Sequence, residues 1–254
     1  LVGDVKRVLA QLNRQLEPQS RVAWINRIDE LKHDHPSHVI KESQAMLPQH
    51  ICREIWEVTK GDAIIVTGVG QHQMWAAQHF NYIKPGSFIT SGGLGTMGFE
   101  VPAALGAKVG KPKETVWSIC GDGGFQMTLQ ELATIVEHNI GVKFAIFNNG
   151  FHGMVRQWQN LFFDNRLSGV DLEGNPDFVK LAESYGIKGF HLRRTADIDK
   201  ILKQAIEYNE GPCVVHAECE KEDNVYPMIP AGAPVHAMIT GPPKKKLAKP
   251  TGST

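Results

Sequence analysis

The sequence lacks an excess of charge of either sign, because Lys and Arg together number 27 and Asp and Glu also number 27. Proteins that bind nucleic acid or membrane surfaces usually carry a basic excess, so neither class is favoured. The chain also lacks an apolar run near the roughly 18 residues that a membrane-spanning helix needs. We therefore expect a globular protein with no nucleic-acid partner and no membrane partner.

Cysteine is scarce, and its four residues form no C-x-x-C pair. Two of them, Cys120 and Cys213, lie in apolar runs that are typical of buried strands. The simplest interpretation is that the thiols are buried and reduced, as in a cytosol-like compartment. We expect a cytoplasmic protein or, in a eukaryote, a protein of the plastid stroma or mitochondrial matrix.

Short apolar segments alternate with segments of helical periodicity along most of the chain. The expected strands are Ala63–Thr67, Phe88–Thr90, Thr115–Cys120, Val142–Asn148, Gly189–Leu192 and Cys213–Ala217. The expected helices are Gln49–Thr59, Trp75–Phe80, Phe99–Val109, Leu129–His138, Asp177–Tyr185 and Ile198–Tyr208. This alternation predicts an α/β fold, a doubly wound parallel sheet with helices on both faces. Ligands of such sheets bind beyond the carboxyl ends of the strands.

The two ends of the chain lack this alternation. An apolar stripe predicts one helix over Leu1–Leu16, and the polar stretch 17–47, which contains Pro18 and Pro36, is interpreted as a linker. Residues 241–254 show no apolar pattern and are expected to be a disordered tail.

A literal G-x-G-x-x-G runs from Gly93 to Gly98, between an expected strand and an expected helix. This motif can indicate a nicotinamide-binding site. Such a site follows the first strand of its unit and places an acidic residue about 20 positions later. Here a strand and a turn precede the motif, and the next strand ends in Cys120. A nicotinamide dehydrogenase therefore stays a weaker hypothesis, and the glycines are explained by tight turns.

Asp122 lies between glycines after one expected strand, and Asn148 and Asn149 end the next. Neighbouring parallel strands bring their ends together, so Asp122 and Asn149 can converge on one point. Carboxylate and amide oxygens suit Mg²⁺ or Ca²⁺, and Mg²⁺ typically completes its shell with phosphate oxygens and water. The Walker lysine motif is absent, so metal and neutral donors at a helix N-terminus must meet the phosphate charge. The sequence thus predicts a metal-diphosphate site.

The spacing from Gly121-Asp122-Gly123 to Asn148-Asn149 resembles the metal-diphosphate motif of thiamine diphosphate enzymes. Four segments resemble the catalytic subunit of acetohydroxyacid (acetolactate) synthase: Gly68–Gln78, Ser91–Ala107, Gly121–Leu132 and Gly153–Phe163. Residues 1–16 resemble the end of that family's middle domain. The resemblance implies that residues 48–240 form the thiamine diphosphate pyrophosphate-binding domain.

The resemblance also implies roles for single residues. Asp122, Asn149 and the backbone carbonyl of Phe151 match the metal ligands. The cofactor-binding set that the resemblance implies is Gly70, Gln71, His72, Gly95, Met97, Gly121, Asp122, Gly123, Gly124, Asn149, Phe151, His152, Gly153, Met154 and Val155. Gln71 and His72 are expected at the end of the first strand, and Met97 matches the apolar residue that wedges between the two cofactor rings.

Met154 and Trp158 match residues that line the family's substrate pocket, and their i, i+4 spacing puts them on one helix face. The segment Pro227–Gly232 resembles the one that covers the site. Glu100 is a departure, because the family usually has a small residue there, often glycine. That departure leaves the local turn, or the first turn of the following helix, open.

The implied reaction is a condensation of pyruvate with a second 2-oxoacid, pyruvate or 2-ketobutyrate, with loss of CO₂. Its products, 2-acetolactate or 2-aceto-2-hydroxybutyrate, lead to branched-chain amino acids, and the cofactor supplies the carbanion chemistry. No catalytic residue is expected in this chain, because the family's activating glutamate lies in an N-terminal domain and FAD lies mainly on the middle domain. We expect a fragment of a longer polypeptide, inactive alone, that forms a homodimer or homotetramer, with a regulatory small subunit as a candidate partner.

Two further hypotheses stay open. The first keeps the cofactor and changes the chemistry, to another thiamine diphosphate-dependent 2-oxoacid decarboxylase, oxidase or carboligase. The second is a non-catalytic module that binds the diphosphate or a partner without turnover.

Overall fold

The computed structural model describes residues 1–36 and 39–242, which form two compact units that divide after Val39. The first unit contains α1 (Val5–Gln15), as predicted, and α2 (Val22–Asp34), which we did not predict within the stretch 17–47. Pro18 and Pro36 lie outside α2, so neither proline interrupts it. The linker role of residues 17–47 stays a prediction, and most of the expected tail, 243–254, lies outside the described residues.

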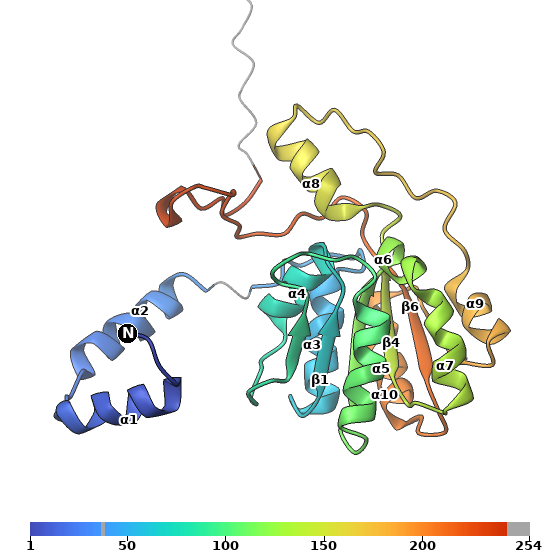
Figure 1. Cartoon of the computed structure of the whole chain (residues 1–254). Coiled ribbons are helices and arrows are strands. Elements are labelled where there is room, and N and C mark those ends of the chain that lie inside the picture. The colour runs from blue at the N-terminus through green and yellow to red at the C-terminus, as the bar shows by residue number, and fades with distance from the viewer. Residues whose placement is uncertain (37–38, 243–254) are drawn as a thin grey trace, which may run out of the picture. The chain divides into compact units, whose positions relative to one another are not determined.

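Six parallel strands form one sheet in the second unit, in the order β2-β1-β3-β4-β6-β5 (Figure 1). Their bounds are β1 (Ile64–Thr67), β2 (Phe88–Thr90), β3 (Val116–Gly121), β4 (Lys143–Asn148), β5 (Lys188–Leu192) and β6 (Cys213–Glu218). Each end agrees with the sequence prediction to within one residue. The all-parallel pairing confirms the predicted α/β fold class.

Helices cover both faces of the sheet, as a doubly wound fold requires. One face packs against α3 (Pro48–Thr59), α4 (Gln71–His79) and α10 (Ile198–Glu207). The other packs against α5 (Glu100–Gly110), α7 (Leu132–Glu137) and α9 (Phe178–Ser184). Successive side chains of β4 alternate between the two cores, with Ala145 and Phe147 in the first and Phe144 and Ile146 in the second.

Two predicted helices differ in detail from the observed ones. The predicted Leu129–His138 is a 3₁₀ turn, Leu129–Glu131, followed by α7. The helix predicted at Trp75–Phe80 is α4, which begins four residues earlier than predicted, directly after Gly70. All four cysteines are buried free thiols, as expected. No helix among the described residues has the length and apolar character to cross a membrane.

The carboxyl ends of β3 and β4 lie side by side, since Gly121 is in register with Phe147. Asp122 therefore begins α6 (Asp122–Met127) next to the Asn148-Asn149 end of β4. Figure 1 shows α8 (Gly153–Phe162) beyond this edge of the sheet. The fold thus collects the polar turns at one edge.

Candidate functional site

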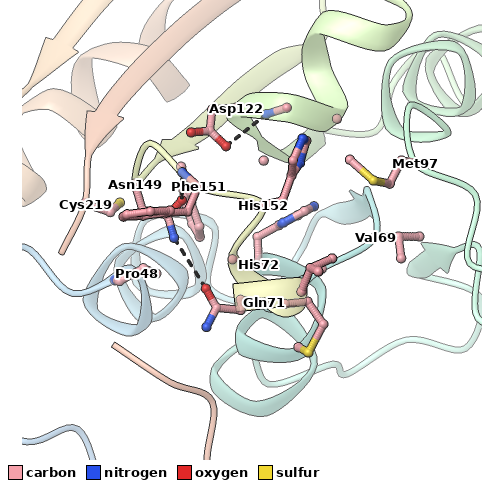
Figure 2. A pocket seen from close by; sticks show the side chains of 18 of the residues that line it. Pro48, Val69, Gln71, His72, Met97, Asp122, Asn149, Phe151, His152 and Cys219 are labelled. Carbon is pink, nitrogen blue, oxygen red and sulfur yellow. Dashed lines mark hydrogen bonds between the residues drawn. The ribbon is translucent and has the colours of Figure 1, made fainter. Parts of the chain in front are cut away.

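A pocket opens at the carboxyl ends of β1, β3 and β4 (Figure 2). Its lining residues include 14 of the 15 that the resemblance assigns to cofactor binding: Gly70, Gln71, His72, Met97, Gly121, Asp122, Gly123, Gly124, Asn149, Phe151, His152, Gly153, Met154 and Val155. Gly95 does not line the pocket, and its role stays a prediction. Residues from distant parts of the sequence thus meet in one cavity.

Asp122 is held by three neutral donors. Its Oδ1 accepts from Gly123 N at 2.9 Å, and its Oδ2 accepts from Gly150 N at 2.9 Å and from Asn175 Nδ2 at 2.8 Å. Burial raises the pKa of this carboxyl group, which is 3% exposed, and the three hydrogen bonds oppose that rise. A buried carboxylate bonded by neutral groups is stabilised further by a cation, so Asp122 fits a metal ligand.

Asn149 is the second predicted ligand, and its amide is oriented from both sides. Its Nδ2 donates to Gln71 Oε1 at 3.4 Å, and its Oδ1 accepts from Phe151 N at 3.2 Å. Gln71 is itself fixed, because its Nε2 donates to Gln157 Oε1 at 2.9 Å. An amide oxygen carries two lone pairs, so Asn149 Oδ1 keeps one for a metal. The carboxylate of Asp122 and the amide of Asn149 form a hard donor set that suits Mg²⁺.

His72 supplies a buried polar atom without a partner. Its Nε2 meets no hydrogen-bond partner within the described chain, although the ring lines the pocket. Burial lowers the pKa of His72 to about 4, so the imidazole is neutral near pH 7. Gln71 and His72 were predicted at the end of the first strand, which is wrong in detail, because they form the first turn of α4. That placement directs the ring beneath Gly121, where an added Cβ would lie 2.8 Å from the ring carbon Cε1.

Met97 lies on the side of the pocket away from Asp122 and Asn149, in the loop between β2 and α5 (Figure 2). Met154 also lines the pocket. Trp158 is on the same helix, α8, as predicted, but it lines a neighbouring pocket with Val155, Gln159, Phe163 and Arg166. Val155 borders both cavities. The substrate roles of Met154 and Trp158 stay predictions.

Gln157 is a residue that our sequence analysis missed. It is fully buried and accepts from Val225 N at 2.8 Å, while its Nε2 donates to Val225 O at 3.1 Å. It also contacts Met228 Sδ at 3.1 Å, so the segment expected to cover the site lies against α8. A polar residue on the buried side of an amphipathic helix is the signal that would have identified it. Asn175, the donor to Asp122, is part of no motif that we recognised.

Glu100 forms the first residue of a regular α5, which resolves the local conformation that the sequence left open. Its carboxyl group is fully buried, and neither oxygen has a hydrogen-bond partner of normal geometry in the described chain. Burial raises the pKa of Glu100 to about 7, against the opposing influence of the backbone N–H groups of Glu100 and Gly98. The group lies below the glycine turns rather than in the pocket lining.

Comparison with known families agrees with this geometry. The family model described as "Thiamine pyrophosphate enzyme, C-terminal TPP binding domain" matches residues 68–217. The chain is 43% identical over 243 residues to an acetolactate synthase of Mycobacterium bovis, covering 91% of this chain and 39% of that protein. It is 38% identical over 239 residues to the acetolactate synthase isozyme 2 large subunit of Escherichia coli, covering 94% and 43%.

The mitochondrial catalytic subunit of acetolactate synthase from Saccharomyces cerevisiae is 40% identical over 248 residues, covering 95% of this chain and 36% of that protein. The chain therefore spans about two fifths of the length of these curated relatives.

Proposed function

This chain belongs to the thiamine pyrophosphate enzymes, as a C-terminal TPP binding domain, and on that premise we propose that its pocket holds thiamine diphosphate through Mg²⁺. The observation that carries the proposal is the convergence of Asp122 and Asn149 at the ends of β3 and β4. Both present hard oxygen atoms, and the carbonyl of Phe151 completes the protein ligands. The unpartnered Nε2 of His72 and the backbone of the glycine turns would contact the diphosphate.

When bound, the cofactor supplies the carbanion chemistry, and the protein supplies position and environment. Asp122 and Asn149 would fix the metal, and Met97, across the pocket, would support the rings. The segment around Met228, which Gln157 holds against α8, would exclude water from one side. Exclusion of water strengthens the electrostatic interactions within such a site.

We further propose that the whole protein condenses pyruvate with a second 2-oxoacid to give acetolactate or its 2-ketobutyrate-derived homologue. The support is the identity of about 40% to proteins named acetolactate synthase. The activating glutamate and most of the FAD site would come from parts of the protein outside this chain. A homodimer or homotetramer, a regulatory small subunit, and a cytoplasmic or organellar location belong to the same proposal.

Calorimetric titration of thiamine diphosphate into this chain, with and without Mg²⁺, tests the binding proposal. We expect binding that depends on Mg²⁺ and is lost in Asp122→Ala, while thermal unfolding is little changed. Asp199→Ala, which removes an exposed carboxylate on α10, is the matched control and should bind as the wild type does. Wild-type affinity in Asp122→Ala would show that the site assignment is wrong.

The activity needs a separate assay on the full-length protein with pyruvate, Mg²⁺ and thiamine diphosphate. We expect acetolactate as the main product. Acetaldehyde or hydrogen peroxide would instead support a decarboxylase or an oxidase on the same cofactor. Tight cofactor binding without any turnover would support a non-catalytic module.

A further inference from the structure

A chain of hydrogen bonds leads from Asp122 away from the pocket. Asn175 Nδ2 donates to Asp122 Oδ2 at 2.8 Å and to Asn148 Oδ1 at 3.0 Å. Asn148 Nδ2 in turn lies 2.9 Å from His216 Nε2. These hydrogen bonds therefore join the start of α6, the turn before α9, the end of β4 and the middle of β6.

Each side-chain amide in this hydrogen-bond network has one orientation. Asn175 Oδ1 accepts from Gln126 Nε2 at 2.9 Å, which directs Asn175 Nδ2 toward Asp122. Asn148 Oδ1 also accepts from Gly150 N at 3.2 Å, which directs Asn148 Nδ2 toward His216. His216 Nε2 must therefore accept, and the neutral imidazole carries its proton on Nδ1. His216 is buried, and burial lowers its pKa, which favours the neutral ring.

His216 also belongs to a cluster with Asp177 and His191, whose potential ligand atoms lie within 4.8 Å of one another. A histidine that binds a metal usually donates its second N–H to an acceptor. His216 Nε2 instead faces the N–H of Asn148. Asp177 Oδ1 already accepts from Val179 N at 3.0 Å and Lys180 N at 3.3 Å as the cap of α9. From these hydrogen-bond directions we infer that the cluster is the outer end of the hydrogen-bond network and does not hold a metal.

We propose that Asn175 and His216 are positioning residues that orient the carboxylate of Asp122 for metal binding. This assignment rests on the magnesium site proposed above. Asn175 and Gly150 N restrain Asp122 Oδ2 together. The same Gly150 N–H also bonds Asn148, so the network fixes the loop that carries Asn149 and Phe151. His216 acts one step further out, as the acceptor that fixes the amide plane of Asn148.

The test is the Mg²⁺ concentration that gives half-maximal thiamine diphosphate binding to this chain, measured by calorimetry. Asn175→Leu, which keeps the size and removes the donor, should raise that concentration about 10- to 100-fold. His216→Phe should raise it less, and His216→Gln, whose amide oxygen can accept from Asn148, should restore it. His191→Phe is the matched control, because His191 packs against His216, at 5.6 Å between ring centroids, but takes no part in the hydrogen-bond network.

Thermal unfolding of each variant separates a loss of metal affinity from a loss of folding. An unchanged Mg²⁺ requirement in folded Asn175→Leu and His216→Phe would overturn the assignment. So would Zn²⁺ binding to the wild type that both His191→Phe and His216→Phe abolish, because that result assigns the cluster to a metal. Failure of the proposed function is distinguishable, since the wild type itself would then show no Mg²⁺-dependent binding.

Discussion

The carboxyl group of Glu100 lies against the backbone of Gly68, so closely that a Cβ on Gly68 would stand 2.5 Å from Glu100 Oε1. Gly124, a predicted cofactor-binding residue in α6, lies against the same oxygen, which an added Cβ would overlap. A buried carboxyl group is therefore accommodated only because both positions are glycine. The resemblance led us to expect a small residue at position 100, and the structure shows instead how the larger Glu100 side chain fits beside these glycines.

Glu100→Gln should remove part of the pH dependence of stability. Burial raises the pKa of Glu100 from 4.5 to about 7, so the folded state binds a proton that the unfolded state has released. The contribution of Glu100 to the free energy of unfolding should therefore fall by about 3 kcal/mol between pH 4.5 and 7. The wild type should lose that much more stability over this range than Glu100→Gln, because the opposite contribution of His72, whose pKa burial lowers to about 4, is present in both. Denaturant unfolding at pH 5 and pH 8, without Mg²⁺, measures the difference. Equal changes in wild type and Glu100→Gln would contradict the prediction.

Gly124→Ala should be coupled to Glu100. The new methyl group would overlap Glu100 Oε1, and overpacking of this kind typically costs about 1–3 kcal/mol. In a Glu100→Ala background the space is free, so the same substitution should cost much less. A double-mutant cycle of unfolding free energies measures the coupling. Strictly additive effects would show that the two residues do not compete for space.

Gly153→Ala should weaken metal-dependent cofactor binding more than it weakens the fold. An added Cβ would overlap Gln71 Oε1 and lie 3.0 Å from Asn149 Nδ2, so it would displace the amide that orients the predicted ligand. We expect the half-saturating Mg²⁺ concentration to rise on the order of tenfold. Gly174→Ala is the control, because no atom lies within 4 Å of its added Cβ. Equal Mg²⁺ requirements in the two variants would contradict this role of Gly153.

Trp158→Leu should alter substrate choice without altering cofactor affinity. Trp158 is 36% exposed and lies in the neighbouring pocket, whereas Met154 lines the cofactor pocket itself. In the full-length protein with pyruvate and 2-ketobutyrate in competition, the product ratio should change about tenfold. Met154→Ala should change both the ratio and the affinity for thiamine diphosphate. A changed cofactor affinity in Trp158→Leu would contradict the placement of the indole in the neighbouring pocket.

The strands and the metal pair were predictable because they depend on local pattern and on one rule of topology. Apolar runs of strand length located all six strands, and a turn that contains glycine follows each of the first four, β1 to β4. Since parallel neighbours end at one edge, Asp122 and Asn149 were expected to meet, and the register of β3 with β4 brings them together. No comparable rule located α2, whose helix lies between two prolines in a polar stretch.

The sequence by itself determined the alternation of strands and helices, the glycine turns and the chemistry of the metal pair, because those features depend on short-range periodicity and residue type. Only the tertiary structure decided that Glu100 is buried, that Trp158 lies outside the cofactor pocket and that Asn175 supports Asp122. Each of these depends on contacts between residues far apart in the chain. Such contacts are set by the packing of whole elements, which no local pattern encodes.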